Sequence, residues 1–142
     1  MAIHSRAALI GATAIMLAAA PAAFAKTVNF SGTFATENGA TTQPMGSVNG
    51  TLDTGTDKVT YVITYSGLSG PVVAAHFHGP ASAGQTAGVL LPIPGPFETG
   101  MHGVLTANAT TVKALMAGKT YVNLHTAKYQ EGEARAQISV TK

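Results

Sequence analysis

The sequence predicts a small antiparallel all-β domain, and three observations support this. Beyond residue 25 the chain is rich in Thr, Val, Ala and Gly. Short segments of alternating polar and apolar residues are separated by Gly, Asn, Asp or Pro, as expected of strands joined by turns. Cysteine is absent, so packing must stabilise the fold without disulfides.

Eight segments have the composition and alternation of strands. In the clearest of them, Val59, Tyr61, Ile63 and Tyr65 alternate with Thr or Val, and the turn residues 53–57 before it predict a hairpin. The predicted strands are Thr27–Ala35, Gly46–Leu52, Lys58–Tyr65, Val72–His78, Val89–Leu91, Gly103–Thr106, Thr120–Thr126 and Ala134–Val140.

One short helix is expected at Thr111–Ala117. Thr110 is a residue type that caps helix N-termini, and Gly118 can end the helix. Residues 84–100 contain three prolines and four glycines, which favour an irregular loop or a broken edge strand.

The first 25 residues have the pattern of a Sec-type signal peptide. His4 and Arg6 precede an apolar run from Ala7 to Ala20, and an Ala-x-Ala motif ends at Ala25. The run is shorter than the roughly 20 residues that cross a bilayer. We expect cleavage after Ala25 and a periplasmic or secreted product, residues 26–142, that forms one domain without a membrane span.

The charge of residues 26–142 is nearly balanced, with seven basic and six acidic side chains. No Lys or Arg cluster could follow a phosphate backbone, so nucleic acid is not an expected partner.

Four histidines lie beyond residue 25, and three of them fall in predicted strands. Because strand residues alternate between faces, His76 and His78 share one face of their strand, as do Tyr121, Asn123 and His125 of another. In the last strand Glu133, Arg135 and Gln137 lie opposite an apolar face. Side by side, the three polar faces could form one site.

His76, His78 and His125 are therefore candidate ligands of one metal ion. Three imidazoles suit copper or zinc and leave a coordination position open. Copper is favoured in an exported chain without thiolates, and zinc is the alternative. His102 could add a fourth ligand if its segment reaches this face, while Asn123, Glu133 and Arg135 could orient the imidazoles. Alternatively, the histidines simply face water or hydrogen-bond to neighbouring residues.

Three segments resemble the CHRD (chordin-type) domain family in order and spacing. They are Ala75-His76-Phe77-His78-Gly79-Pro80-Ala81, Tyr121-Val122-Asn123-Leu124-His125-Thr126 and Gly132-Glu133-Ala134-Arg135-Ala136-Gln137-Ile138. The resemblance covers nearly all of residues 28–140. It implies an immunoglobulin-like antiparallel β-sandwich of Greek-key type and an exported protein, and it carries the motif histidines over as His76, His78 and His125.

Three functions are consistent with these features. The first is a metal-binding module. The second is a non-metal interaction domain that contacts another envelope protein through the same face or residues 84–100. The third is a copper-dependent redox enzyme distantly like Cu/Zn superoxide dismutase, which is itself a β-sandwich. The chain lacks that enzyme's disulfide cysteines and has no evident zinc loop. No general base stands out beside the histidines, so an enzyme is not favoured.

Overall fold

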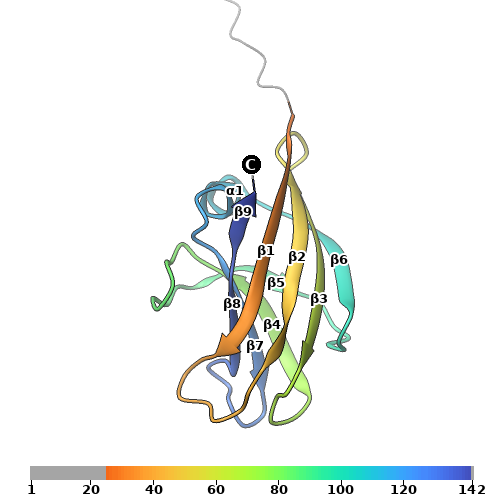
Figure 1. The fold of residues 1–142 in the computed structure, drawn as a ribbon. Coiled ribbons are helices and arrows are strands. Elements are labelled where there is room, and N and C mark those ends of the chain that lie inside the picture. Colours follow the sequence, from red (N-terminus) through yellow and green to blue (C-terminus); the bar gives the residue numbers. More distant parts are fainter. Residues whose placement is uncertain (1–24, 142) are drawn as a thin grey trace, which may run out of the picture.

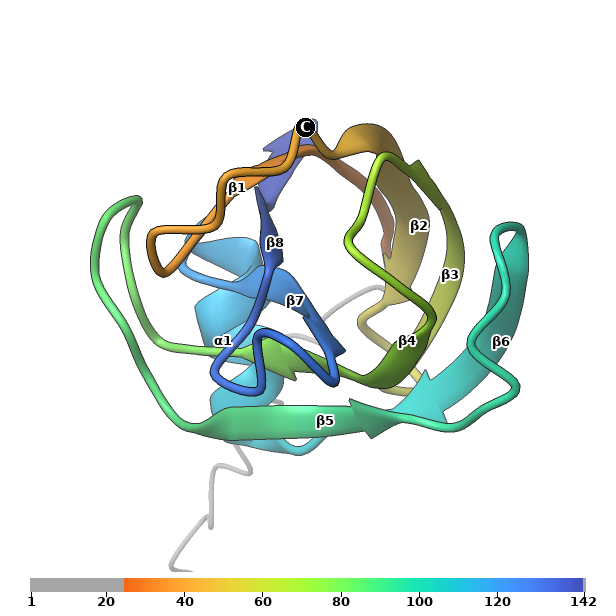
Figure 2. The same ribbon diagram turned by 90° about the horizontal axis from the view of Figure 1, so that it is seen from below.

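The strands of the chain pair into one antiparallel sheet that curls until it is nearly barrel-shaped (Figure 1, Figure 2). The computed structural model describes residues 25–141, and the predicted signal peptide lies outside these residues except for Ala25. The elements are β1 (Thr27–Thr36), β2 (Met45–Asp53), β3 (Lys58–Ser66), β4 (Val72–His78), β5 (Val89–Ile93), β6 (Met101–Thr106), α1 (Ala109–Met116), β7 (Tyr121–Thr126), β8 (Ala134–Gln137) and β9 (Ser139–Thr141).

The strand order is β5-β4-β7-β8-β1-β2-β3-β6, and β9 also pairs with β1. The predicted hairpin is present as β2 and β3, and Asp53 Oδ1 accepts hydrogen bonds from the backbone N–H groups of Gly55 and Thr56 in its turn. All eight predicted segments form strands. The all-β prediction is therefore confirmed.

The last predicted strand is interrupted once, between β8 and β9. Both pieces pair with β1 in the same register, Phe34 with Ala136 and Phe30 with Val140. At the interruption the Ile138 N–H donates to Thr120 O instead, at 2.9 Å. A residue in strand alternation can still leave the ladder where the sheet bends, which the sequence pattern does not reveal.

The short helix is present, but its predicted N-cap was wrong. The helix α1 begins at Ala109, and Asn108 is the N-cap, with an extended backbone and a side chain that accepts from Thr111 N at 2.9 Å. Asn108 precedes the first helical residue and so can satisfy a free N–H group, whereas Thr110 is already inside the helix. Among residues 25–141, no helix has the length and apolar character needed to span a bilayer.

The core lies between the two halves of the curled sheet. The apolar residues of β1, β2 and β3 on one side meet those of β4, β7 and β8 on the other. The ring of Phe77 in β4 packs edge-on against both Phe30 and Tyr61, with centroid distances of 6.2 and 6.1 Å. Phe77 thus joins the two halves of the core.

Replacing Phe77 with Ala should lower the free energy of unfolding by about 3–5 kcal/mol, because it removes a buried ring and leaves a cavity. Val73 lies on the same strand with 53% of its surface exposed. The matched variant Val73→Ala should therefore change stability by less than about 0.5 kcal/mol. Urea unfolding monitored by circular dichroism measures both, and equal losses would show that Phe77 does not join the core.

Candidate metal centre

The polar faces of β4, β7 and β8 lie side by side, as the alternation predicted. His76 is opposite Asn123, and His78 is opposite Tyr121 in the β4–β7 pair. Asn123 is in turn opposite Arg135 in the β7–β8 pair. The apolar faces of the same strands contribute to the core. The sheet therefore collects these polar side chains on its outer surface.

Loops cover much of this outer surface. Every residue of β7 is buried, although only one face of the strand points into the core. Residues 37–42, 82–87 and 129–131 supply contacts to the polar face, through the side chain of Glu37 and the backbone of Ala87 and Gln130 among others. The site is thus a polar layer under loops.

Three imidazoles converge in this layer. His76, His78 and His125 each offer one ring nitrogen, and these nitrogens all lie within 4.8 Å of one another. His76 Nδ1 and His125 Nε2 are 3.1 Å apart. Three atoms with these separations lie within about 2.8 Å of a common point, close to the roughly 2.0–2.1 Å of a metal–imidazole bond.

Two backbone carbonyls determine which ring nitrogens carry protons. His78 Nδ1 is 3.0 Å from Ala87 O, and His125 Nδ1 is 2.8 Å from Gln130 O. Because a carbonyl oxygen only accepts, Nδ1 must be the donor in both rings, and each neutral ring keeps its lone pair on Nε2. His78 Nε2 is buried without a hydrogen-bond partner. A buried lone pair without a partner is uncommon, and a metal ion would satisfy it.

The environment favours the neutral imidazoles that bind metals. Burial lowers the pKa of His76, and the neighbouring His125 and His78 lower it further. Burial also lowers the pKa of His78, although its hydrogen bond to Ala87 O partly offsets this effect. Protons therefore compete less with a metal ion at these two rings than at an exposed histidine.

His78 is supported on one side by an aromatic ring. Its imidazole stacks on Tyr121 at a centroid distance of 5.0 Å, and the Arg135 guanidinium lies 3.5 Å above the Tyr121 ring. Arg135 NH1 forms a salt bridge of 3.0 Å with Glu37 Oε1. The structure thus places Arg135 against Tyr121, the ring that stacks on His78.

Asn123 contacts the same ion pair. Its Nδ2 donates to Glu37 Oε2, and its Oδ1 is buried without a partner. Gly132 packs against the amide, since a Cβ at this position would lie 2.1 Å from Asn123 Oδ1. Gly132 also has a φ of +113°, which a larger residue rarely adopts.

Glu133 is fully buried and supports the loops around the site. Its two carboxylate oxygens accept four hydrogen bonds, from Thr42 Oγ1, Ser69 N, Ser69 Oγ and Thr126 Oγ1, at 2.6–2.7 Å. Burial by itself raises the pKa of Glu133, but these hydrogen bonds outweigh it and hold the pKa below its ordinary value. Glu133 contacts Thr126, next to His125, and no hydrogen bond joins it to a histidine among the described residues.

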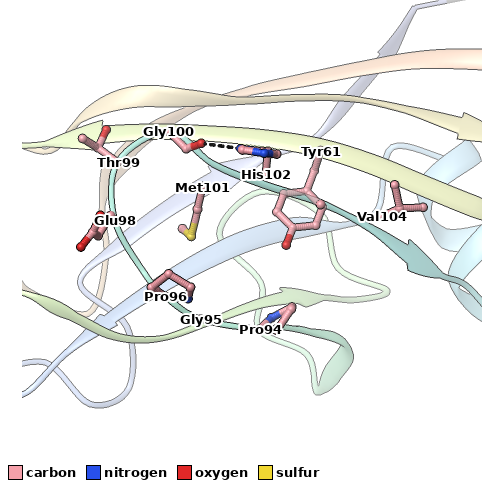
Figure 3. Close-up of a pocket in the computed structure, with 11 residues that line it drawn as sticks. Tyr61, Pro94, Gly95, Pro96, Glu98, Thr99, Gly100, Met101, His102 and Val104 are labelled. Carbon is pink, nitrogen blue, oxygen red and sulfur yellow. Dashed lines mark hydrogen bonds between the residues drawn. The ribbon is translucent and has the colours of Figure 1, made fainter.

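His102 lies apart from the other three histidines. It is on β6, the last strand of the order, whereas β4 is the second, and it is exposed with Nδ1 3.1 Å from Gly100 O. Figure 3 shows His102 at a pocket away from the three converging histidines, together with Tyr61, Met101 and the prolines of the β5–β6 connection. The group of converging ligand atoms in residues 25–141 contains His76, His78 and His125 without it.

Several contacts of the site were not predicted from the sequence. Glu37 follows β1 and meets Arg135, which is 98 positions away. Ala87 and Gln130 contribute backbone carbonyls, for which side-chain identity gives no signal. An acid two residues beyond a predicted strand, Thr27–Ala35, was the one available sign for Glu37.

Replacing Glu133 with Gln should destabilise the protein by about 1–3 kcal/mol, because four donors lose their charged acceptor in a buried position. Glu98 is an exposed acid, and Glu98→Gln removes the same charge where it is solvated, so its stability should change little. Thermal unfolding compares the two variants. A loss of equal size in both would attribute the effect to net charge.

Acidification should destabilise the metal-free protein. The pKa values of His76 and His78 in the folded protein lie below the ordinary 6.5. Below pH 6.5 the unfolded chain therefore binds more protons than the folded protein, and stability decreases as the pH is lowered. Unfolding in the presence of a chelator at pH 7.5, 6.5 and 5.5 measures this slope. The slope should be shallower in His76→Gln than in the unmodified protein, and equal slopes in the two proteins would contradict the assignment.

Comparison with known proteins supports the family resemblance. The family model described as the CHRD domain matches residues 26–138. Searches of curated proteins and of solved structures gave no match. The matched range includes β1 to β8, α1 and all three converging histidines. The chain belongs to the CHRD domain family.

Proposed function

We propose that this CHRD domain binds one copper ion through His76, His78 and His125, with zinc as the less favoured alternative. The observation that carries the proposal is the unpartnered, buried Nε2 of His78 beside two other converging imidazoles. Bringing the nitrogens to normal metal–imidazole distances requires movements of at most about 0.7 Å. Movements of this size need only small rotations of the rings.

The donor set favours copper over zinc. Imidazole binds both ions, but divalent copper forms the more stable complexes with a given set of nitrogen ligands. No thiolate competes, because the chain has no cysteine. Three imidazoles also leave at least one coordination position for another ligand.

We further propose that the domain works outside the cytoplasm, in the periplasm or after secretion. The support is the signal-peptide pattern of residues 1–25. Copper binding and export together describe a protein that holds or transfers copper in the cell envelope.

A binding role fits the surroundings better than catalysis. The carboxylate of Glu37 is paired with Arg135 and Asn123, and that of Glu133 is surrounded by hydroxyl and N–H donors. Neither carboxylate is free to act as a general base beside the imidazoles. The redox-enzyme alternative would require a substrate at the open position.

Titration of the protein, expressed without a histidine tag, with Cu(II) and Zn(II) tests the proposal. One equivalent of copper should bind more tightly than zinc and give an electron paramagnetic resonance spectrum with nitrogen hyperfine structure. His76→Ala and His125→Ala should weaken binding by at least about a hundredfold, since loss of contacts even beyond the ligands costs 10–100-fold.

His102→Ala is the matched control, because it removes an imidazole that lies outside the converging group. Its copper affinity should equal that of the unmodified protein. Unchanged affinity in His76→Ala and His125→Ala would overturn the proposal, and absence of binding by either ion would favour the interaction-domain alternative.

A further inference from the structure

A small cavity adjoins the histidines. It has a volume of about 240 Å³, and both His78 and His125 line it. Asn123, Tyr121 and Glu37 lie on its wall, together with residues of three loops, namely Asn38, Thr86, Ala87, Gln130 and Glu131. No Lys or Arg lines this cavity in the described part of the chain. Its wall is therefore rich in hydrogen-bond acceptors.

The orientation of the Asn123 amide is determined by its neighbours. Glu37 Oε1 forms a salt bridge with Arg135, and the second carboxylate oxygen, Oε2, accepts a hydrogen bond from Asn123. The amide must turn Nδ2 toward Glu37, which leaves Oδ1 as its free end. Asn123 is 97% buried, with 3% of its surface exposed, and Oδ1 has no partner.

The cavity is thus lined by two residues that each have a buried hydrogen-bond acceptor without a hydrogen-bond partner. These acceptors are Nε2 of His78 and Oδ1 of Asn123. The first is a ligand for a metal ion, and the second can accept a hydrogen bond from whatever occupies the next coordination position. Arg135 does not counter this polarity, because its guanidinium donates to Glu37, Gln85 O, Ser82 O and Gln137.

On the basis of the proposed copper site, we infer that its open position selects neutral ligands that carry a hydrogen-bond donor and rejects small anions. Water, or a neutral nitrogen ligand with an N–H group, can bind the metal and donate to Asn123 Oδ1. An anion without a proton, such as azide or superoxide, would meet this oxygen in a cavity that no described Lys or Arg lines. The inference separates this site from enzymes that attract anionic substrates.

The unmodified protein loaded with one Cu(II) provides the first test. Azide serves as the anionic probe and neutral imidazole as the donor-bearing probe, each followed by optical and electron paramagnetic resonance spectra at pH 8. Imidazole should bind at a concentration at least about tenfold lower than azide, because imidazole can donate a hydrogen bond to Asn123 Oδ1 and azide cannot.

The variant Glu37→Gln tests the role of Asn123. Arg135 only donates, so Gln at position 37 would keep its oxygen toward Arg135 and turn its NH₂ group toward Asn123. The Asn123 amide should then reverse and present its own NH₂ to the cavity. Azide affinity should rise by about tenfold or more.

Glu131→Gln is the matched control, because Glu131 also lines the cavity and loses the same charge, but its carboxylate makes no hydrogen bond to Asn123. The rise in azide affinity should be clearly smaller in Glu131→Gln than in Glu37→Gln. Circular dichroism and copper stoichiometry verify that both variants are folded and loaded. If Glu37→Gln does not fold, the comparison of azide with imidazole in the unmodified protein tests the inference.

The outcomes distinguish this inference from the copper site itself. If no copper binds, both fail. If copper binds but azide competes as well as imidazole, only the inference about the open position is overturned. Equal azide affinities in Glu37→Gln and Glu131→Gln would show that charge, and not the Asn123 amide, determines ligand choice.

Discussion

The burial of β7 on both faces is the constraint on which the site depends. One face of β7 belongs to the core through Val122 and Leu124, and the other carries Asn123 and His125 beneath loops. Polar groups on a buried face must find partners, because each unpaired group costs free energy. The loops therefore provide structural contacts to this layer, and two of their carbonyls contact the rings of His78 and His125.

Charge in this layer is balanced locally. Arg135 is paired with Glu37, and Glu133 is satisfied by four hydroxyl and N–H donors without a cation. Burial and mutual proximity keep His76 and His78 neutral at higher proton concentrations than an exposed histidine. Protons therefore compete less for these two imidazoles than for those of an exposed histidine.

The sequence was sufficient for the strands and the converging histidines, because both follow from period-two alternation. The spacing of His76 and His78 alone puts them on one face of their strand. The same pattern at Asn123 and His125 indicated a second strand with a polar face, and the structure pairs these two strands. The sequence did not reveal which strands lie beside β6, since a single His in a Gly-flanked segment does not indicate strand order. His102 therefore lies far along the sheet from the other three. Glu37 was missed because its partner Arg135 is distant in sequence.

The contacts that prepare the imidazoles come from the backbone, and this explains why sequence patterns do not reveal them. Ala87 O and Gln130 O fix the tautomers of His78 and His125 whatever side chains stand at those positions. These carbonyls reach the imidazoles only if the backbone of their loops has the correct conformation. Glu133 supports one of these loops, since it ties Thr126 and the start of β8 to the loop at Ser69 and to Thr42. Its four hydrogen bonds thus tie together the segments on either side of Gln130, although Glu133 forms no hydrogen bond with the imidazoles.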